Sequence, residues 1–192
     1  GGQRQAAPTS RAALRPPHRP VTVTDQGRLP LLDTADLLGR CTFAPRNTAV
    51  TCGLSGGADS TAMVALAVEA GCKVTAVHIH HGLRASADAD ADIARAVATH
   101  FDVPFRSIAV DVADGPNLEA RARTARRAAL GHDALTGHTA DDQAETLLLA
   151  LLRGSGAAGL GAIGPGWRHP ILALRRTETH SLCEQFGLAV AD

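Results

Sequence analysis

The chain has 192 residues, of which 45% are apolar and 20% are charged, a composition typical of a globular protein with one main core. Its 19 basic and 19 acidic residues give a formal net charge of zero, which argues against indiscriminate binding to nucleic acid. The four cysteines lack the spacing of a zinc or iron–sulfur motif, and no apolar run approaches the roughly 20 residues of a membrane span, so we expect a reduced, cytoplasmic protein.

The N-terminal region is basic and has no periodic pattern. Residues 1–30 contain five arginines among prolines and small residues but a single acid, Asp25. A short amphipathic helix is predicted over 31–38. We therefore divide the chain into a basic arm with a short helix, 1–47, and a main domain, 48–192. The arm is either a solvated tail or an auxiliary contact for RNA.

Strand and helix patterns alternate through the main domain. Buried apolar runs predict strands at 49–54, 73–78, 105–110 and 134–137. Helical spacing predicts helices at 60–70, 86–101, 118–130 and 140–153, the last with a leucine stripe, and a further helix at 177–186. This order predicts an α/β fold, a doubly wound parallel sheet with helices on both faces and ligands at the carboxyl ends of its strands.

Two connections are abrupt for such a fold. Residues 131–133 alone separate a long helix from a very short predicted strand, and 165–166 join a glycine-rich stretch directly to Trp167. We expect residues to be absent at both places and after Asp192.

The most informative segment follows the first strand and reads Ser-Gly-Gly-Ala-Asp-Ser at 55–60. Adjacent glycines let backbone N–H groups converge on an anion, and the start of the next helix adds unpaired N–H groups and a positive dipole. The hydroxyls of Ser55 and Ser60 can donate to the same anion. A carboxylate beside phosphates requires a cation, so we interpret Asp59 as a Mg²⁺ ligand. The alternative is a plain strand-to-helix turn capped by Ser60.

Two commoner nucleotide signatures do not apply. A Walker A loop needs a lysine after its last glycine, and the one lysine of the chain, Lys73, lies on the next predicted strand. A Gly-x-Gly-x-x-Gly match at Gly154, Gly156 and Gly159 follows a helix, whereas the dinucleotide fingerprint follows a strand.

A second polar segment, 138–146, lies at the end of the fourth predicted strand. Thr139 is a predicted helix N-cap with Asp142 at the third helical position, so a capping box explains part of the pattern. It does not explain paired carboxylates beside His138. We favour the interpretation that Asp141 or Asp142 shares a metal with Asp59.

A third segment, 78–84, ends the second strand with three histidines and an arginine. A zinc site is disfavoured because His78 and His80 alternate faces of a strand and no acid or cysteine accompanies them. We favour Arg84 as the functional residue, with a solvated surface arginine as the alternative.

From about Ala49 to the end, the chain resembles the N-type ATP pyrophosphatases, also called PP-loop enzymes, and within them the tRNA(Ile)-lysidine synthases. Segment 55–60 is similar to the loop of the whole superfamily, which implies an adenine nucleotide alpha hydrolase-like, Rossmann-like fold and cleavage of ATP to AMP and pyrophosphate. The resemblance to lysidine synthases lies in four further segments, 81–86, 117–126, 138–146 and 153–160.

This resemblance implies adenylation of the wobble cytidine in an isoleucine tRNA with a CAU anticodon, followed by displacement of AMP by free L-lysine. It implies ATP and Mg²⁺ as cofactors and no membrane partner, and a homodimer is left open. Nucleotide contacts would come from Ser55, Gly56, Gly57, Asp59, Ser60, His78 and Arg84. Catalytic roles would belong to Asp59, Arg84, His138 and Asp142, with Asp59 and Asp142 as the metal ligands. The lysine and tRNA side would be lined by Glu119, Arg123, Arg126, Asp141, Glu145 and Arg153.

The chain departs from the family pattern at two positions: His80 stands where Asp or Asn is usual, and Arg127 where an aromatic residue is usual. Three other functions remain open: a tRNA thiolase, which would be expected to carry paired cysteines, an ammonia-dependent amide synthetase that forms AMP without RNA, and a non-catalytic ATP-binding module.

Overall fold

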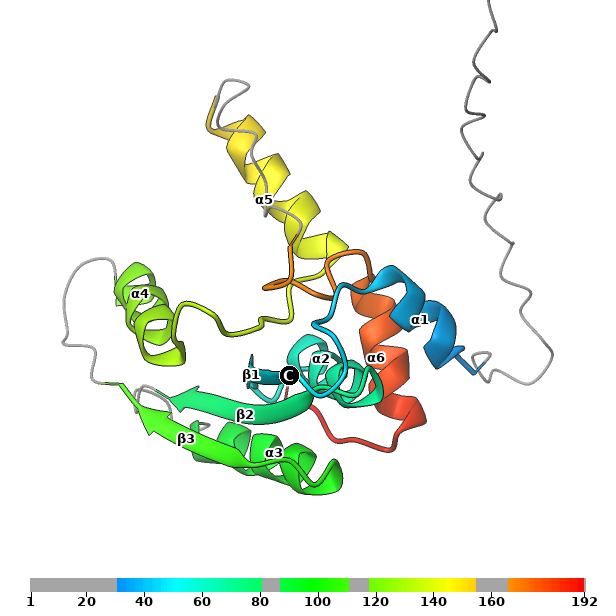
Figure 1. The fold of residues 1–192 in the computed structure, drawn as a ribbon. Coiled ribbons are helices and arrows are strands. Elements are labelled where there is room, and N and C mark those ends of the chain that lie inside the picture. The colour runs from blue at the N-terminus through cyan, green and yellow to red at the C-terminus, as the bar shows by residue number, and fades with distance from the viewer. Residues whose placement is uncertain (1–30, 81–86, 111–117, 155–165, 192) are drawn as a thin grey trace, which may run out of the picture. The chain divides into compact units, whose positions relative to one another are not determined.

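The computed structural model describes residues 31–80, 87–110, 118–154 and 166–191 (Figure 1). Several sequence predictions fall outside these residues: the arm at 1–30, Arg84 within 81–86, Asn117, and the glycines Gly156 and Gly159. The side chain of Glu119 is likewise not described. In the described part of the chain, no helix has the length and apolar character needed to cross a membrane.

The centre of the domain is a parallel sheet with strand order β1-β2-β3 (Figure 1). Strand β1 (Ala49–Gly53) pairs with β2 (Lys73–His80), and β2 pairs with β3 (Phe105–Ala109). All three strands follow the predicted apolar runs. Because every pairing is parallel, the carboxyl ends of the strands meet at one edge of the sheet.

The predicted fourth strand, 134–137, is reduced to a single bridge. Leu135 pairs in parallel with Cys52, through bonds from Gly53 N–H to Leu135 O (3.0 Å) and from Leu135 N–H to Thr51 O (2.8 Å). The next residue leaves the ladder because the Thr136 amide donates to the carbonyl of Arg168 at 2.9 Å. The expected strand is therefore wrong in extent and right in its place beside β1.

Six helices are described, each ending or beginning close to its predicted bounds. They are α1 (Thr34–Arg40), α2 (Ala58–Glu69), α3 (Ala87–His100), α4 (Leu118–Leu130), α5 (Ala140–Leu152) and α6 (Arg176–Gln185). Helices α3 and α4 lie on opposite faces of the sheet (Figure 1). This arrangement confirms the doubly wound α/β prediction.

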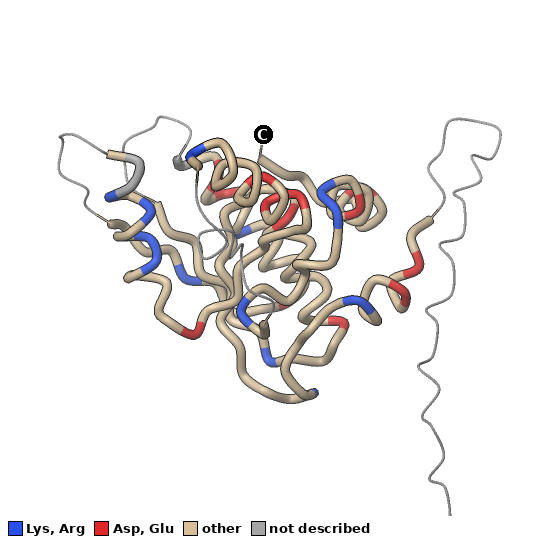
Figure 2. The backbone as a smooth tube through the Cα atoms, turned by 90° about the horizontal axis from the view of Figure 1, so that it is seen from above, with Lys and Arg blue, Asp and Glu red and all other residues tan. Residues whose placement is uncertain are grey.

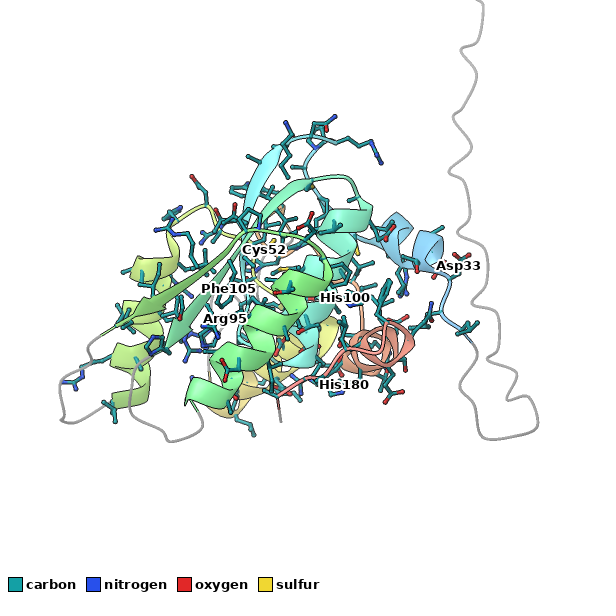
Figure 3. All side chains as sticks on the ribbon, turned by 90° about the horizontal axis from the view of Figure 1, so that it is seen from below. Asp33, Cys52, Arg95, His100, Phe105 and His180 are labelled. Atoms are coloured by element: carbon teal, nitrogen blue, oxygen red, sulfur yellow. The ribbon has the colours of Figure 1, made fainter. Side chains whose placement is uncertain are left out.

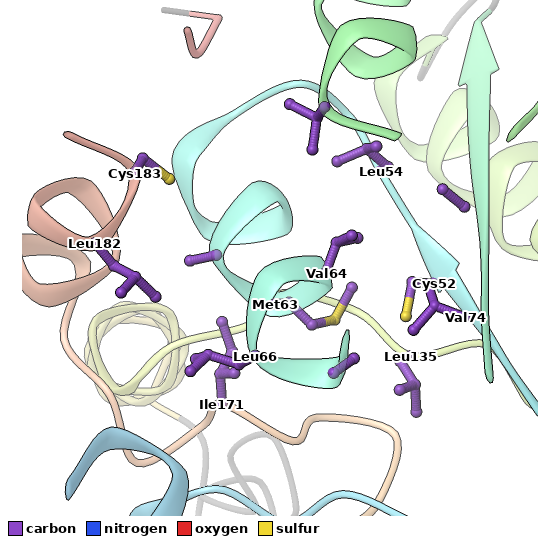
Figure 4. Packing of buried hydrophobic residues seen from close by; sticks show 14 of the residues in the cluster. Cys52, Leu54, Met63, Val64, Leu66, Val74, Leu135, Ile171, Leu182 and Cys183 are labelled. Atoms are coloured by element: carbon purple, nitrogen blue, oxygen red, sulfur yellow. The ribbon is translucent and has the colours of Figure 1, made fainter. Parts of the chain in front are cut away.

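Helix α2 forms the middle of the core. Its residues from Ser60 to Ala67 are all buried, and Met63 and Leu66 have no exposed surface. A helix that is apolar around its whole circumference must be covered on all sides. Figure 4 shows how this is met, with Cys52 and Val74 of the sheet on one side and Leu182 of α6 on the other.

Helix α3 covers the β2–β3 side of the sheet. Its Ala94, Val97 and Ala98 are buried, and the guanidinium of Arg95 lies 5.5 Å from the centre of the Phe105 ring on β3 (Figure 3). This cation–π contact adds to the packing of the helix on the strand.

Helix α5 differs from the others because it has no buried residue. Its leucine stripe is exposed to solvent, with 59% of Leu148 and 83% of Leu152 accessible. The first two turns of α5 carry its polar contacts with Arg176, so these turns, and not the stripe, matter for the site.

Candidate functional site

The glycine-rich loop between β1 and α2 has the backbone geometry that its sequence predicts. Gly56 is buried and has φ +98°, a left-handed conformation that favours glycine. Gly57 is the N-cap of α2. The helix therefore begins at Ala58, two residues before the predicted start, and Ser60 lies in its first turn instead of capping it. The first-turn amides of α2 have no partner within the helix, which leaves them available to an anion.

The two loop serines hold each other in place. Their hydroxyl oxygens are 3.0 Å apart, and Ser60 Oγ also accepts from the Ser55 amide at 3.1 Å. Ser60 Oγ donates to the carbonyl of Gly57 at 2.9 Å. Ser60 is buried and Ser55 is exposed, so the hydroxyl of Ser55 is the more accessible one.

His78 lies on β2 beneath this loop and is 4% exposed. Its Nδ1 is 2.8 Å from the carbonyl oxygen of Leu54, the residue immediately before the loop. Burial lowers the pKa of His78, and the hydrogen bond to Leu54 only partly offsets that effect. The neutral ring thus supports the loop backbone through Nδ1–H, while its predicted contact with a nucleotide stays a prediction.

The second polar segment packs directly onto the first. A Cβ atom on Gly137 would lie 2.8 Å from the carbonyl carbon and oxygen of Asp59 and 2.8 Å from the Ser60 nitrogen. Only a glycine allows this approach without a shift of the backbone. Segments that are almost 80 positions apart in the sequence thereby meet, so Asp59 and His138 belong to one site.

Thr139 and Asp142 fix the start of α5. Thr139 is the fully buried N-cap, and its amide and hydroxyl both donate to Asp142 Oδ2, at 2.7 and 3.0 Å. This confirms the predicted cap and the third helical position of Asp142. Burial works against ionisation of Asp142, but the bonds from Thr139 and the charge of Arg176 outweigh it and hold the pKa of Asp142 below its ordinary value.

Arg176, at the start of α6, lies at the centre of the acidic side chains. Its guanidinium is 3.0 Å from Asp142 Oδ1, 3.1 Å from Glu145 Oε1 and 3.6 Å from Asp59 Oδ2. Its backbone amide donates to Asp141 Oδ2 at 2.8 Å. Burial opposes its charge, yet Glu145, Asp142 and Asp59 raise the pKa of Arg176. The four acids predicted as metal or substrate ligands therefore converge on one residue, three on its guanidinium and one on its backbone amide.

Helix α6 supplies a second contact that the sequence reading missed. The buried hydroxyl of Thr179 donates to Asp59 Oδ1, and Cys183 Sγ lies 3.4 Å from the carbonyl of Ala58. Arg176 and Thr179 have no motif of their own, and the sequence predicted a helix at 177–186 without a functional role. The signal that was available is electrostatic: four clustered acids need a cation from another segment.

The remaining predicted residues are distributed unevenly. Arg123 and Arg126 on α4 are exposed. Burial is the largest cause that lowers the pKa of His138, and the charge of Arg123 lowers it further. Burial is likewise the largest cause for His78, and the charge of Arg126 adds to it. Both arginines therefore act electrostatically on the site. Arg153 is at the far end of α5, roughly 16 Å along the helix from Asp142 at about 1.5 Å per residue, and is not brought to the acids.

The carboxylates of Asp59 and Asp142 fit a Mg²⁺ ion in part. They share one cation, because Arg176 contacts an oxygen of each. Among the described residues no set of three or more ligating side chains gathers at one point. Mg²⁺ commonly takes one or two carboxylates and completes its shell with water and phosphate oxygens, so two carboxylates suit a metal that arrives with a polyphosphate.

Comparison with known proteins identifies the family of this fold. Residues 34–189 match the family described as PP-loop domain. The chain is 46% identical over 149 residues to a tRNA(Ile)-lysidine synthase from Nocardia farcinica, which covers 73% of the chain and 47% of that protein. It is 43% identical over 156 residues to the protein of the same name from Rhodococcus erythropolis, covering 76% of the chain and 47% of that protein. The chain thus spans about half the length of the curated relatives it matches.

Solved structures agree with this fold at low sequence identity. A U34-tRNA thiolase from Methanococcus maripaludis has a TM-score of 0.62 at 17% identity, covering 83% of this chain and 64% of that one. An NMN synthetase from Francisella tularensis has a TM-score of 0.52 at 18% identity, covering 81% of this chain and 69% of that one. At such identities the likeness concerns the fold alone.

Proposed function

Since the chain belongs to the PP-loop family, we propose that it carries out the chemistry of a tRNA(Ile)-lysidine synthase in the cytoplasm. It binds ATP, adenylates the C2 oxygen of the wobble cytidine in an isoleucine tRNA with a CAU anticodon, and joins L-lysine to the base. AMP and diphosphate are released.

One observation carries this proposal: the loop at 55–60 and the segment at 138–146 form one site. The first is common to the superfamily, whereas the second resembles lysidine synthases, and Gly137 brings it against the backbone of Asp59. Identity of 41–46% to curated lysidine synthases supports the same substrate.

The residues of the site have roles that follow from their positions. The first-turn amides of α2 and the hydroxyl of Ser55 face the diphosphate part of ATP, where a helix N-terminus favours negative charge. Mg²⁺ held by Asp59 and Asp142 would offset charge on the phosphates. Arg176 lies among the same carboxylates, and its guanidinium can stabilise negative charge that develops on the phosphate during the reaction.

The acidic cluster also suits the second substrate. Asp59, Asp142 and Glu145 face the single guanidinium of Arg176, and Asp141 accepts from its backbone amide, so negative charge is in excess there. A lysine ammonium group or a divalent cation reduces that excess. The exposed arginines of α4 follow one another along that helix and suit the tRNA backbone (Figure 2).

The test mixes the full-length protein with ATP, Mg²⁺, labelled lysine and the CAU-anticodon isoleucine tRNA, and measures label in the RNA. We expect incorporation by the wild type and its loss in Asp59→Asn. The matched control is Asp102→Asn, a change of the same kind in an exposed turn at φ +51°, a conformation that Asn tolerates.

Each negative outcome points to a different alternative. If diphosphate release depends on tRNA but no lysine is incorporated, lysine is not the nucleophile, and a thiolase is favoured. AMP formation that needs no RNA favours an amide synthetase. If the wild type and the control are both folded and bind ATP but release no diphosphate, the chain is a non-catalytic ATP-binding module.

A further inference from the structure

One hydroxyl in the domain bridges two histidines. Thr136 Oγ1 is 2.8 Å from His138 Nδ1 and 2.8 Å from His169 Nδ1. The two rings meet edge to face with centroids 4.9 Å apart. The bridge is held in place by the backbone, because the Thr136 amide donates to the Arg168 carbonyl at 2.9 Å. Neither Thr136 nor His169 has a role in the site as described so far.

The shorter contacts of the bridge favour two rings that differ in tautomer. A threonine hydroxyl has a single hydrogen, and its three neighbours are the two Nδ1 atoms at 2.8 Å and the Arg168 carbonyl oxygen at 3.4 Å. The hydroxyl donates to one of the nearer Nδ1 atoms and accepts from the other. One histidine therefore carries its proton on Nδ1 and the other on Nε2. Transfer of one proton along the chain of three groups exchanges these states.

The two ends of the bridge face different surroundings. His138 is close enough to Asp142 and Asp59 for both carboxylates to influence its ionisation, so its ring belongs to the site. His169 lines a surface pocket of about 230 Å³ together with Arg40 and Gln143. The bridge thus runs from the carboxylate cluster to a space that water can fill.

We propose that His138, Thr136 and His169 form a proton relay that removes the proton of the attacking amine from the site, with Thr136 and His169 as positioning residues. This inference rests on the proposed function, because it assigns the acceptor for the second half of that reaction.

The relay balances the transfer step. The lysine side chain attacks as the neutral amine, its ammonium proton having passed to water. Its ε-nitrogen forms a bond to C2 of the adenylated base, the C–O bond to AMP breaks, and AMP leaves with the electron pair. The nitrogen then has one proton too many, which passes to His138 Nε2. His138 Nδ1–H passes its proton to the Thr136 oxygen, the hydroxyl proton moves to His169 Nδ1, and His169 Nε2–H releases a proton to water in the pocket.

The charges around both rings are compatible with a relay that starts neutral. Burial is the main cause that lowers the pKa of His138, with Arg123 and Arg127 acting in the same direction and Asp142 and Asp59 against it. Burial also lowers the pKa of His169, and the nearby His138, Arg168 and Arg127 lower it further. Both imidazoles are therefore neutral at pH 7, and each has one ring nitrogen without a proton.

The first test reads the tautomers directly and needs no substrate. Long-range ¹H–¹⁵N correlation spectra of ¹⁵N-histidine-labelled protein above pH 7 should show opposite tautomers for His138 and His169. In Thr136→Val both rings lose the shared partner, and we expect the opposition to disappear, whereas Thr136→Ser should keep it. Two identical tautomers in the folded wild type would overturn the relay.

The second test separates transfer from adenylation. We expect Thr136→Val to lower the ratio of the lysine-transfer rate to the adenylation rate by about 10²-fold or more, the lower end of general acid–base effects. Thr136→Ser should restore the ratio, and His169→Asn should lower it and shift its pH profile. An unchanged ratio in both Thr136→Val and His169→Asn contradicts the relay, while absence of tRNA adenylation in the wild type contradicts the proposed function instead.

Discussion

At the scale of single residues, Arg176 connects the acids that the sequence had grouped as ligands. It contacts three carboxylates through one guanidinium and a fourth through its backbone amide. Its planar fork of five donors suits this multiple contact, and a lysine ammonium would not reproduce it. A cation in this position can neutralise the cluster in the free protein and act on phosphate charge when ATP is bound.

We therefore predict that Arg176→Gln lowers ATP-dependent diphosphate release by about 10²-fold or more, the range seen when one preorganised donor is removed. Arg176→Lys should retain part of the activity because it keeps the charge but not the fork. Arg175→Gln is the matched control, since it removes the neighbouring, exposed arginine. Equal activity of the two glutamine variants, measured by diphosphate release, would show that Arg176 has no part in the reaction.

At the scale of elements, the helices could be predicted from the sequence and their contacts could not. Helix α4 has the predicted bounds, because its arginine-rich pattern is local. The strand at 134–137 failed because Thr136 bonds to Arg168, a partner more than thirty residues away. The hydrogen bond from Thr179 to Asp59 was missed for the same reason, because it depends on the packing of α6 on α2, which no local sequence pattern encodes. The polar groups of the segments 55–60 and 138–146 could be identified from the sequence, whereas Arg176 and Thr179, which contact them from α6, could not.

The approach of the second loop to α2 leads to a prediction about Gly137. In Gly137→Ala the new Cβ must displace backbone atoms of Asp59 and Ser60 at 2.8 Å, so we expect a loss of about 1–3 kcal/mol in the free energy of unfolding, as in other overpacked sites. The shift of Asp59 should also lower diphosphate release by up to about 10²-fold.

Gly39→Ala provides the control for this prediction, because nothing lies within 4 Å of a Cβ at this helical position. Alanine there should stabilise the fold by about 0.5–1 kcal/mol. Urea titration of both variants, together with diphosphate release, distinguishes them. A Gly137→Ala protein as stable and active as Gly39→Ala would mean that the loops do not need this contact.

At the scale of the whole domain, zero net charge conceals a separation of charges. In the described part of the chain, acids gather at the start of α5 around Arg176, and arginines gather along α4 (Figure 2). Composition alone argued against indiscriminate binding to nucleic acid, and the fold presents a basic surface beside an acidic site. Such a division lets one site receive both a polyanion and a cationic amine.

The ionisation of buried groups makes stability depend on pH in two separate windows. Burial lowers the pKa of His78, His138 and His169 below their unfolded value of about 6.5. As pH falls through that value, the unfolded chain binds protons that the folded chain refuses, so stability decreases. Asp142 has a lowered pKa as well, and its contribution is present above about pH 4 and is lost as pH falls through its folded value.

We predict that the free energy of unfolding, measured by urea titration at constant ionic strength, is highest near pH 7–8 and declines from about pH 6.5 downward, with a further decline below about pH 4. His78→Gln should weaken the first decline, because it removes a buried imidazole that is 4% exposed and replaces it with an amide that can still donate to Leu54. His180→Gln, at an exposed position of α6 (Figure 3), is the matched control and should keep the decline of the wild type. A stability that is constant or rises between pH 8 and pH 5 would mean that these rings are accessible to protons in the folded domain, and the neutral start of the Thr136 relay would then have to be abandoned.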